Sequence, residues 1–317
     1  MPYDRPFQQE QMGGCHTWRC EMSQFKRLFV MLGPQMRHTP ALQRAAALAE
    51  SSGALLDINV FVDDVDTFGL MSDGRERERL LSDNRQWLSD EAEQLSNSGL
   101  DVSTELLLTR DPLASALEQV ERLGCDLLIK DVQHEPVLKR LLVTPLDWQL
   151  LKDSPVAVHL VSDIRLPLPR QVAAAVDLNS HGAGEHLDEQ VIHSAHALAL
   201  QCNAELHLLH VCDAAKTHIA DFGAGTVTMP GFDGSVRTAQ RTAFNRLGDH
   251  HEIPLERRHF LEGPAIRAIA QFVSHNRADV IVMGSHRHDA MQTFLGGTTA
   301  HVLEHPLCNV LAIKATR

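Results

Sequence analysis

Two glycine-containing segments near the end of the sequence carry the residues best suited to bind phosphate. The first, Gly284-Ser285-His286, directly follows the apolar run Asp279–Met283. The second is Leu295–Ala300, whose glycines precede the hydroxyl donors Thr298 and Thr299. Glycines after a strand and at a helix start let backbone N–H groups approach an anion, and the helix dipole favours negative charge there. The pattern predicts either a phosphate cradle or only the turn by which an α/β unit changes direction.

The nineteen histidines raise a second possibility, a metal site. Four of them fall in loops expected at one rim of the protein: His181, His186, His286 and His288. No spacing typical of a zinc site supports them, so we interpret them as solvated and expect no bound metal. His193 and His196, three residues apart, are expected to flank the apolar face of a helix. No catalytic triad, nucleophile elbow or paired carboxylate motif is present, so we assign no catalytic residues.

The chain contains one pattern twice, which predicts two similar domains. Asp126–Ile129 and Asp279–Val282 lie 153 residues apart, and the last apolar runs, matched at Val156 and Val310, lie 154 apart. Such an offset is much longer than a solenoid repeat and close to the length of one ordinary domain.

We therefore divide the chain into four parts. Residues 1–21 form a flexible N-terminal extension, and residues 22–163 form the first domain. Residues 164–170 contain alternating prolines, which favour an extended linker, and residues 171–317 form the second domain.

Apolar runs alternate with amphipathic segments in both halves. The expected strands of the first half cover residues 27–32, 54–62 and 101–108, with two more between 125 and 161. Those of the second half cover residues 171–176, 205–212, 258–261, 279–283 and 309–313. Regular strand–helix alternation predicts an α/β fold of two tandem, doubly wound parallel-sheet domains. Ligands bind such sheets beyond the carboxyl ends of the strands, where strand order reverses.

Composition narrows the function class. The formal net charge of −12 argues against nonspecific binding to nucleic acid or to an anionic membrane, both of which require clustered basic residues. No window approaches the roughly 18 apolar residues that span a bilayer, and the polar N-terminus lacks the apolar core of a signal peptide. We expect a cytoplasmic protein with reduced cysteines, several of them buried in apolar segments. These are Cys125, Cys202, Cys212 and Cys308.

Several segments together resemble the universal stress protein family. They are Asp279–His286, Phe294–His305 and Cys308–Ile313 in the second half, and Thr144–Leu151 in the first half is similar to tandem, E-type members. The resemblance implies two domains with the adenine-nucleotide alpha-hydrolase-like fold, related by a pseudo-twofold axis. It also implies that the last strands of the two halves pair within one chain as a pseudo-dimer, with a homodimer of whole chains as an additional option.

Nucleotide-binding members of the family carry the motif Gly-x2-Gly-x9-Gly-Ser/Thr. Gly284 matches the first glycine, Gly297 the third and Thr298 the hydroxyl residue, whereas Arg287 replaces the second glycine. Arg287 would either contact phosphate through its guanidinium or break a loop position that requires glycine.

The resemblance therefore implies a site for ATP with Mg²⁺, or for another adenine nucleotide, in the second half. Asp177 would lie beside the ribose or adenine, and the backbone of Val211 would meet the adenine edge. The complete set of expected binding residues is Asp177, Val211, Met283, Gly284, Arg287, Gly297, Thr298 and Thr299.

The first half departs from the motif. Asp131 stands at the first glycine, Thr144 and Pro145 replace the third glycine and the hydroxyl residue, and Gly33 replaces the acidic residue. An aspartate would repel phosphate, and proline removes an N–H donor. We expect no nucleotide at this loop.

The sequence thus predicts a cytosolic tandem stress-response protein that binds an adenine nucleotide in its second half. One alternative is a slow Mg²⁺-dependent ATPase, although no general base is evident. Another is a stress protein without a ligand, or one that binds a different small molecule in the first half.

Overall fold

The computed structural model of this 317-residue chain describes residues 25–35, 37–64, 74–132, 146–162, 164–178, 183–212, 232–285 and 308–314. The strands of the first half are β1 (Arg27–Leu32), β2 (Leu55–Asp63), β3 (Val102–Thr109), β4 (Leu127–Asp131) and β5 (Ala157–Val161). Those of the second half are β6 (Gln171–Val176), β7 (Glu205–Cys212), β8 (Arg258–Glu262), β9 (Val280–Ser285) and β10 (Asn309–Lys314). The helices are α1 (Pro40–Ser52), α2 (Gly74–Asn97), α3 (Pro112–Leu123), α5 (Leu146–Asp153), α6 (Ala183–Cys202), α8 (Phe232–His250) and α9 (Ala265–Asn276), with a short 3-10 turn η2 (Leu255–Arg257).

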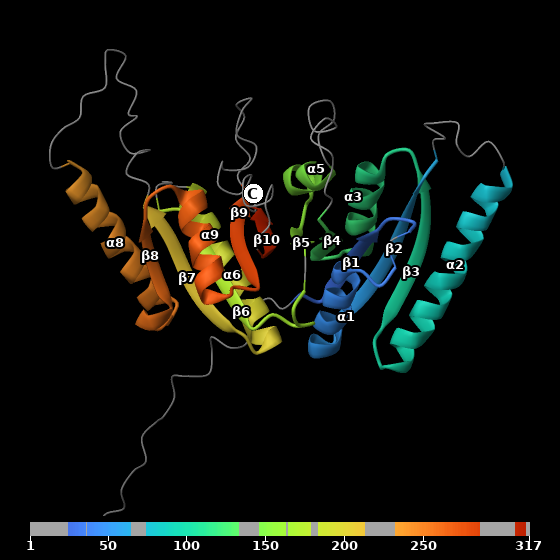
Figure 1. Ribbon diagram of the computed structural model, residues 1–317, viewed down its shortest axis with the longest axis horizontal. Coiled ribbons are helices and arrows are strands. Elements are labelled where there is room, and N and C mark those ends of the chain that lie inside the picture. The colour runs from blue at the N-terminus through green and yellow to red at the C-terminus, as the bar shows by residue number, and fades with distance from the viewer. Residues whose placement is uncertain are drawn as a thin grey trace, which may run out of the picture.

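These strands form one sheet in the order β3-β2-β1-β4-β5-β10-β9-β6-β7-β8 (Figure 1). Within each half, neighbouring strands are parallel and their order is third, second, first, fourth, fifth. Strand order therefore reverses between β1 and β4 and again between β6 and β9, the kind of position at which doubly wound sheets bind ligands. The predicted fold class is confirmed.

The antiparallel pair of β5 and β10 joins the two halves at the centre of the sheet. His159 lies opposite Leu311, and the neighbouring pairs are Leu160 with Val310 and Val158 with Ala312. His159 and Leu311 are also counterparts, because each is aligned with the equivalent residue of the preceding strand, Ile129 or Val282. The pseudo-twofold axis therefore passes between them, and the predicted pairing of the last strands within the chain is confirmed.

The last strands align differently from the sequence comparison. We matched Val310 with Val156, but in the sheet Leu128 pairs with Val158 and its counterpart Ile281 pairs with Val310. Val158 is therefore the true counterpart of Val310, and the earlier match was wrong by two residues. A two-residue shift leaves every side chain on the same face of a strand, so the apolar pattern alone does not reveal it.

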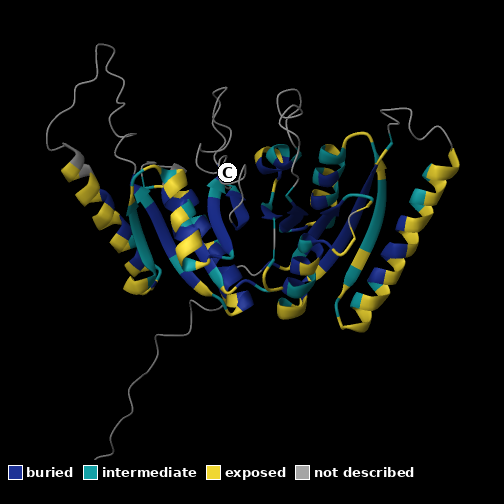
Figure 2. Cartoon of the chain, in the orientation of Figure 1, coloured by how far each residue is buried: buried dark blue, intermediate teal, exposed yellow. Residues whose placement is uncertain are grey.

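Helices cover both faces of the sheet, and each face has a core that continues across the two halves. One core contains Leu48 of α1 and Leu198 of α6, together with residues of α2 and α8. The other contains Leu150 of α5 and Phe272 of α9, together with residues of α3. The central strands are buried, whereas the outward surfaces of α2 and α8 are exposed (Figure 2).

The repeated aspartate has the same structural role in both halves. Asp126 Oδ2 accepts a hydrogen bond from the backbone N–H of Lys26 at 2.7 Å, just before β1. Asp279 Oδ2 accepts one from the N–H of Arg170 at 2.8 Å, just before β6. Each aspartate thus fixes the first strand of its half beside the fourth, which explains why the sequence repeat is clearest there.

Most element boundaries agree with the sequence expectation to within a few residues, and the four cysteines assigned to apolar segments are free and buried. Linker residues 164–170 form neither helix nor strand. The N-terminal extension, residues 1–21, and the glycine-containing segment Leu295–Ala300 lie outside the described residues. Across the described residues, every helix is too short or too polar to cross a membrane.

Candidate functional site

The carboxyl ends of β6, β7 and β9 bring four of the expected site residues together. Met283 pairs with Ala175 of β6, so Gly284 lies one step further toward the carboxyl edge. Asp177 directly follows β6 and is exposed, and Val211 lies on the adjacent strand β7. Asp177 and Gly284 therefore flank the position where strand order reverses, and Val211 lies one strand further out. Arg287, Gly297, Thr298 and Thr299 lie outside the described residues.

The start of α6 fits closely against this edge. The backbone N–H of Asp177 donates to Oδ1 of the buried Asp188 at 2.9 Å, which ties the end of β6 to the first turns of α6. A side chain at Gly284 would place its Cβ 2.5 Å from Cδ2 of the buried Leu187. A larger residue here would force the Leu187 side chain to move, so glycine also favours the packing of α6 against β9.

His210 lies buried beneath this edge. Its Nδ1 lies 3.1 Å from the carbonyl oxygen of Val176, to which it donates. Burial lowers the pKa of His210 below its ordinary value. Its ring also contacts that of Phe260, with ring centroids 5.4 Å apart.

The corresponding edge of the first half is hollow. A cavity of about 230 Å³ is lined by Gly33, Phe61 and Lys130, together with Met31, Leu32, Pro34, Val62, Asp63, Thr109, Pro112 and Leu146. Strand register makes Phe61 the counterpart of Val211 and Lys130 the counterpart of Met283. The cavity therefore occupies the place in the first half that the expected nucleotide site occupies in the second.

Lys130, which lines this cavity, belongs to a buried ion pair. Lys130 Nζ lies 2.8 Å from Asp147 Oδ1 and 2.9 Å from the carbonyl oxygen of Asp131. The two paired side chains are only 5% and 10% exposed. Asp147 lies in the first turn of α5, and the sequence analysis did not identify it or its partner as site residues.

Asp131 is also used within the first half. Its Oδ1 accepts a hydrogen bond at 2.9 Å from the N–H of Ala41, in the first turn of α1. Burial raises the pKa of the Asp131 carboxyl group. The carboxylate thus occupies a helix N-terminus, the kind of position at which an anionic ligand would otherwise be favoured.

The loop histidines do not form a described metal site. His186 is exposed, and His181, His286 and His288 lie outside the described residues. On α6, His193 is exposed and His196 is half-buried, which agrees with their expected place beside the apolar face.

The universal stress protein family model matches residues 24–162 and 170–314. Universal stress protein E of Photorhabdus laumondii is 29% identical over 307 residues, which cover 92% of this chain and 96% of the relative. Universal stress protein E of Escherichia coli K12 is 28% identical over 310 residues, covering 92% and 95% of the two chains.

Two solved structures share the fold over nearly the full length. A Pseudomonas aeruginosa PAO1 protein of unknown function superposes with a TM-score of 0.72 at 24% identity, covering 93% of this chain and 94% of that chain. A universal stress protein from Archaeoglobus fulgidus superposes with a TM-score of 0.65 at 16% identity, covering 90% and 96%. Because the family model matches both halves, this chain belongs to the universal stress protein family and is a tandem member with two such domains.

Proposed function

We propose that this tandem universal stress protein acts in the cytoplasm in stress resistance and binds one adenine nucleotide, ATP with Mg²⁺, in its second half. Asp177 contacts the ribose or adenine, and the backbone of Val211 meets the adenine edge. The loop after Gly284, with Gly297, Thr298 and Thr299, holds the phosphates. The protein acts as a nucleotide-dependent binding module, and the chain offers no residue that we would assign as a general base for hydrolysis.

One observation carries this proposal. The two positions where strand order reverses, called switch points below, differ in the way a nucleotide site requires. In the second half, Gly284 leaves the end of β9 without a side chain, and the exposed Asp177 stands beside it. In the first half the matching positions hold Asp131, whose carboxylate binds the start of α1, and Gly33. A carboxylate next to phosphate is unfavourable because like charges repel.

Calorimetric titration with ATP and Mg²⁺ tests the assignment on two matched variants. Asp177→Ala removes a carboxylate from the second-half edge and should weaken ATP binding by about 1.5–3 kcal/mol, the range for a hydrogen bond to a charged group. Asp63→Ala removes a carboxylate from the end of β2, at the first-half cavity, and should leave the affinity unchanged. Equal losses in both variants, or none in Asp177→Ala, would contradict the site.

The cavity supports a second candidate function, the binding of a small molecule by the first half. Its volume of about 230 Å³ is below the roughly 300–1,000 Å³ typical of pockets for drug-sized ligands. Mostly apolar walls suit a compact, mostly apolar molecule, because the ammonium group of Lys130 is already neutralised by Asp147. Native mass spectrometry of the purified protein should then reveal a retained small molecule that is absent from Leu146→Trp, in which an indole fills the cavity. A mass equal to that of the bare chain would argue against this function.

A further inference from the structure

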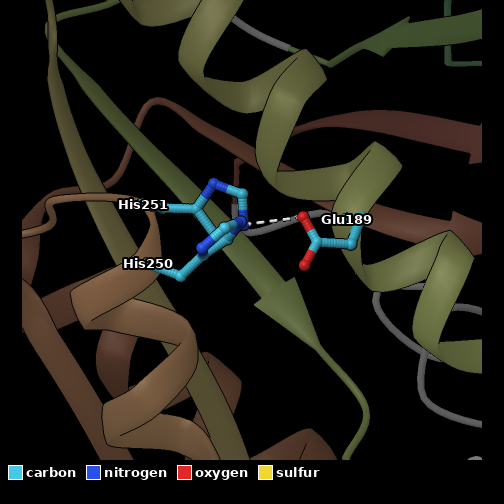
Figure 3. A group of neighbouring side chains, drawn as sticks. All are labelled: Glu189, His250 and His251. Carbon is cyan, nitrogen blue, oxygen red and sulfur yellow. Dashed lines mark ion pairs between the residues drawn. The ribbon is translucent and has the colours of Figure 1, made fainter.

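A group of imidazoles and a carboxylate lies between α6 and the end of α8, apart from both switch points. Glu189 of α6, His250 and His251 each offer one ligand atom, and these atoms all lie within 4.8 Å of one another (Figure 3). Figure 3 shows the carboxylate directed from its helix toward the two rings, which come from consecutive residues at the end of α8.

Glu189 and His251 form a close ion pair whose atoms are not aligned as in an ordinary hydrogen bond (Figure 3). His251 Nε2 lies 2.8 Å from Glu189 Oε2, yet this buried nitrogen has no hydrogen-bond partner of acceptable geometry. Two potential metal-ligand atoms that are this close, but not aligned on each other, can both be directed toward a third atom. Such convergence is the arrangement that a bound cation requires.

The turn that carries the two histidines is held rigidly. Arg258 Nη1 donates to the carbonyl oxygen of Asn245 at 3.1 Å and to Asp249 Oδ1 at 2.7 Å, and its Nε donates to the carbonyl oxygen of Ile253 at 2.6 Å. One buried guanidinium thus binds backbone on both sides of the histidine pair. Ligands placed on such fixed elements lose little conformational entropy when they bind a metal.

A further imidazole lies at the border of the group. His193 follows Glu189 by four residues on α6, so the two lie on the same face of the helix. The rings of His193 and His251 meet edge to face with their centroids 5.4 Å apart, and those of His250 and His251 are 4.9 Å apart.

We propose that Glu189, His250 and His251 bind one Zn²⁺ ion, which fastens the end of α8 to α6. Two imidazoles and one carboxylate are a set of protein ligands that zinc accepts, with the fourth position left for water or another side chain. Imidazole nitrogen favours zinc and its transition-metal neighbours, whereas Mg²⁺ and Ca²⁺ prefer oxygen ligands throughout. His193 borders the group through the contact of its ring with that of His251.

Competition of the metal-free full-length protein with a zinc-chelating indicator tests the site. The Cys15→Ser, Cys20→Ser double variant serves as the background, because those two thiols lie beside His16 and could bind zinc themselves. We expect one Zn²⁺ per chain. Glu189→Gln and His250→Ala should each weaken its binding about tenfold or more, since even outer-shell substitutions cost that much. His275→Ala, which removes an exposed histidine of α9, is the matched control and should change nothing.

Two further readouts separate a metal site from a structural contact. Zn²⁺ should raise the unfolding temperature of the parent protein but not of His250→Ala, because a ligand stabilises the state that binds it, and Mg²⁺ should raise neither. Replacement by Co²⁺ should give visible bands of four-coordinate nitrogen and oxygen ligation. Unchanged zinc affinity in both Glu189→Gln and His250→Ala, or six-coordinate Co²⁺ spectra, would overturn the proposal.

Discussion

The two halves of this chain fold alike but use the carboxyl ends of their strands differently. Where the second half has Gly284, with Leu187 packed against it, the first half has Asp131, whose carboxylate binds the start of α1. Where the second half has Met283, the first has Lys130 paired with Asp147. The first half thus places paired charges at its switch point, whereas the second has the uncharged residues Met283 and Gly284 at the same positions.

This difference indicates how a duplicated domain can lose one function without losing its fold. The sheet, both cores and the central strand pair depend on apolar positions that the two halves share. The residues that differ lie at the edge of the sheet, where substitutions affect ligand binding more than folding. In the first half, the buried ion pair of Lys130 and Asp147 lies at this edge and links β4 to α5.

The largest expected effect is the loss of nucleotide binding in Gly297→Asp. A carboxylate at this position would face the phosphates, and apposed like charges cost several kcal/mol. Thr144→Asp introduces the same charge at the matching position of the first half and should leave ATP affinity unchanged. Calorimetric titration of both variants measures the asymmetry, and similar behaviour of the two would break the comparison.

His159, which lies beside the pseudo-twofold axis, should make the free energy of unfolding depend strongly on pH. Burial, reinforced by the nearby charge of Arg44, lowers the pKa of His159 from 6.5 to about 3. Its Nδ1 donates to the Val310 carbonyl, and its Nε2 has no partner among the described residues. The unfolded chain therefore binds a proton that the folded chain excludes, and stability is lost as the pH falls from 6.5 toward 3.

At about 1.4 kcal/mol per pKa unit, this histidine alone accounts for the loss of up to about 5 kcal/mol of folding stability over this pH range. His159→Leu places on the axis the residue type of its counterpart Leu311, and should flatten the dependence of the unfolding free energy on pH across that range. Urea unfolding at several pH values compares the two slopes. Parallel slopes would show that His159 is not the residue responsible.

The buried ion pair gives the next effect. Lys130→Met introduces the residue type of the second half but leaves the carboxylate of Asp147 buried without its cation, which should cost about 3–5 kcal/mol of stability. Adding Asp147→Ala, which introduces the residue found at the matching position, Ala300, should restore most of the lost stability. Chemical denaturation of the single and double variants measures both effects, and a double variant no more stable than the single would refute the internal-charge account.

The smallest effect concerns Arg287 and distinguishes its two interpretations. If its guanidinium contacts phosphate, Arg287→Ala should weaken ATP binding by about 1.5–3 kcal/mol. If the side chain only disturbs a glycine position, Arg287→Gly should strengthen binding instead. Titration of both variants decides between them, and unchanged affinity in both would place the loop away from the phosphates.

The sequence was sufficient to predict the fold because the information needed was local. Apolar runs, the repeated aspartates and the proline starts of α1 and α3 each act within a few residues of their position. The pairing of the last strands followed from the resemblance to a family, although their alignment was wrong by two residues. That error arose because side-chain alternation repeats every two residues and is unchanged by such a shift.

Features that depend on distant residues could not be predicted in the same way. Asp147 and Lys130 are 17 residues apart in the sequence, and only the tertiary structure brings them together. Glu189 and the histidine pair at the end of α8 lie on separate helices, so no sequence spacing marked them as a group. Gly284 was interpreted as part of a phosphate cradle or of a turn, whereas its place against Leu187 gives it a packing role as well.

Hydrogen–deuterium exchange with and without ATP and Mg²⁺ tests the central claim most directly, because it follows both switch points in one experiment. We predict that nucleotide protects the backbone at the ends of β6, β7 and β9 and in the loop after Gly284. The ends of β1, β2 and β4 should exchange at the same rate in both conditions. Equal protection at both switch points, or protection confined to the first half, would contradict the asymmetry proposed here.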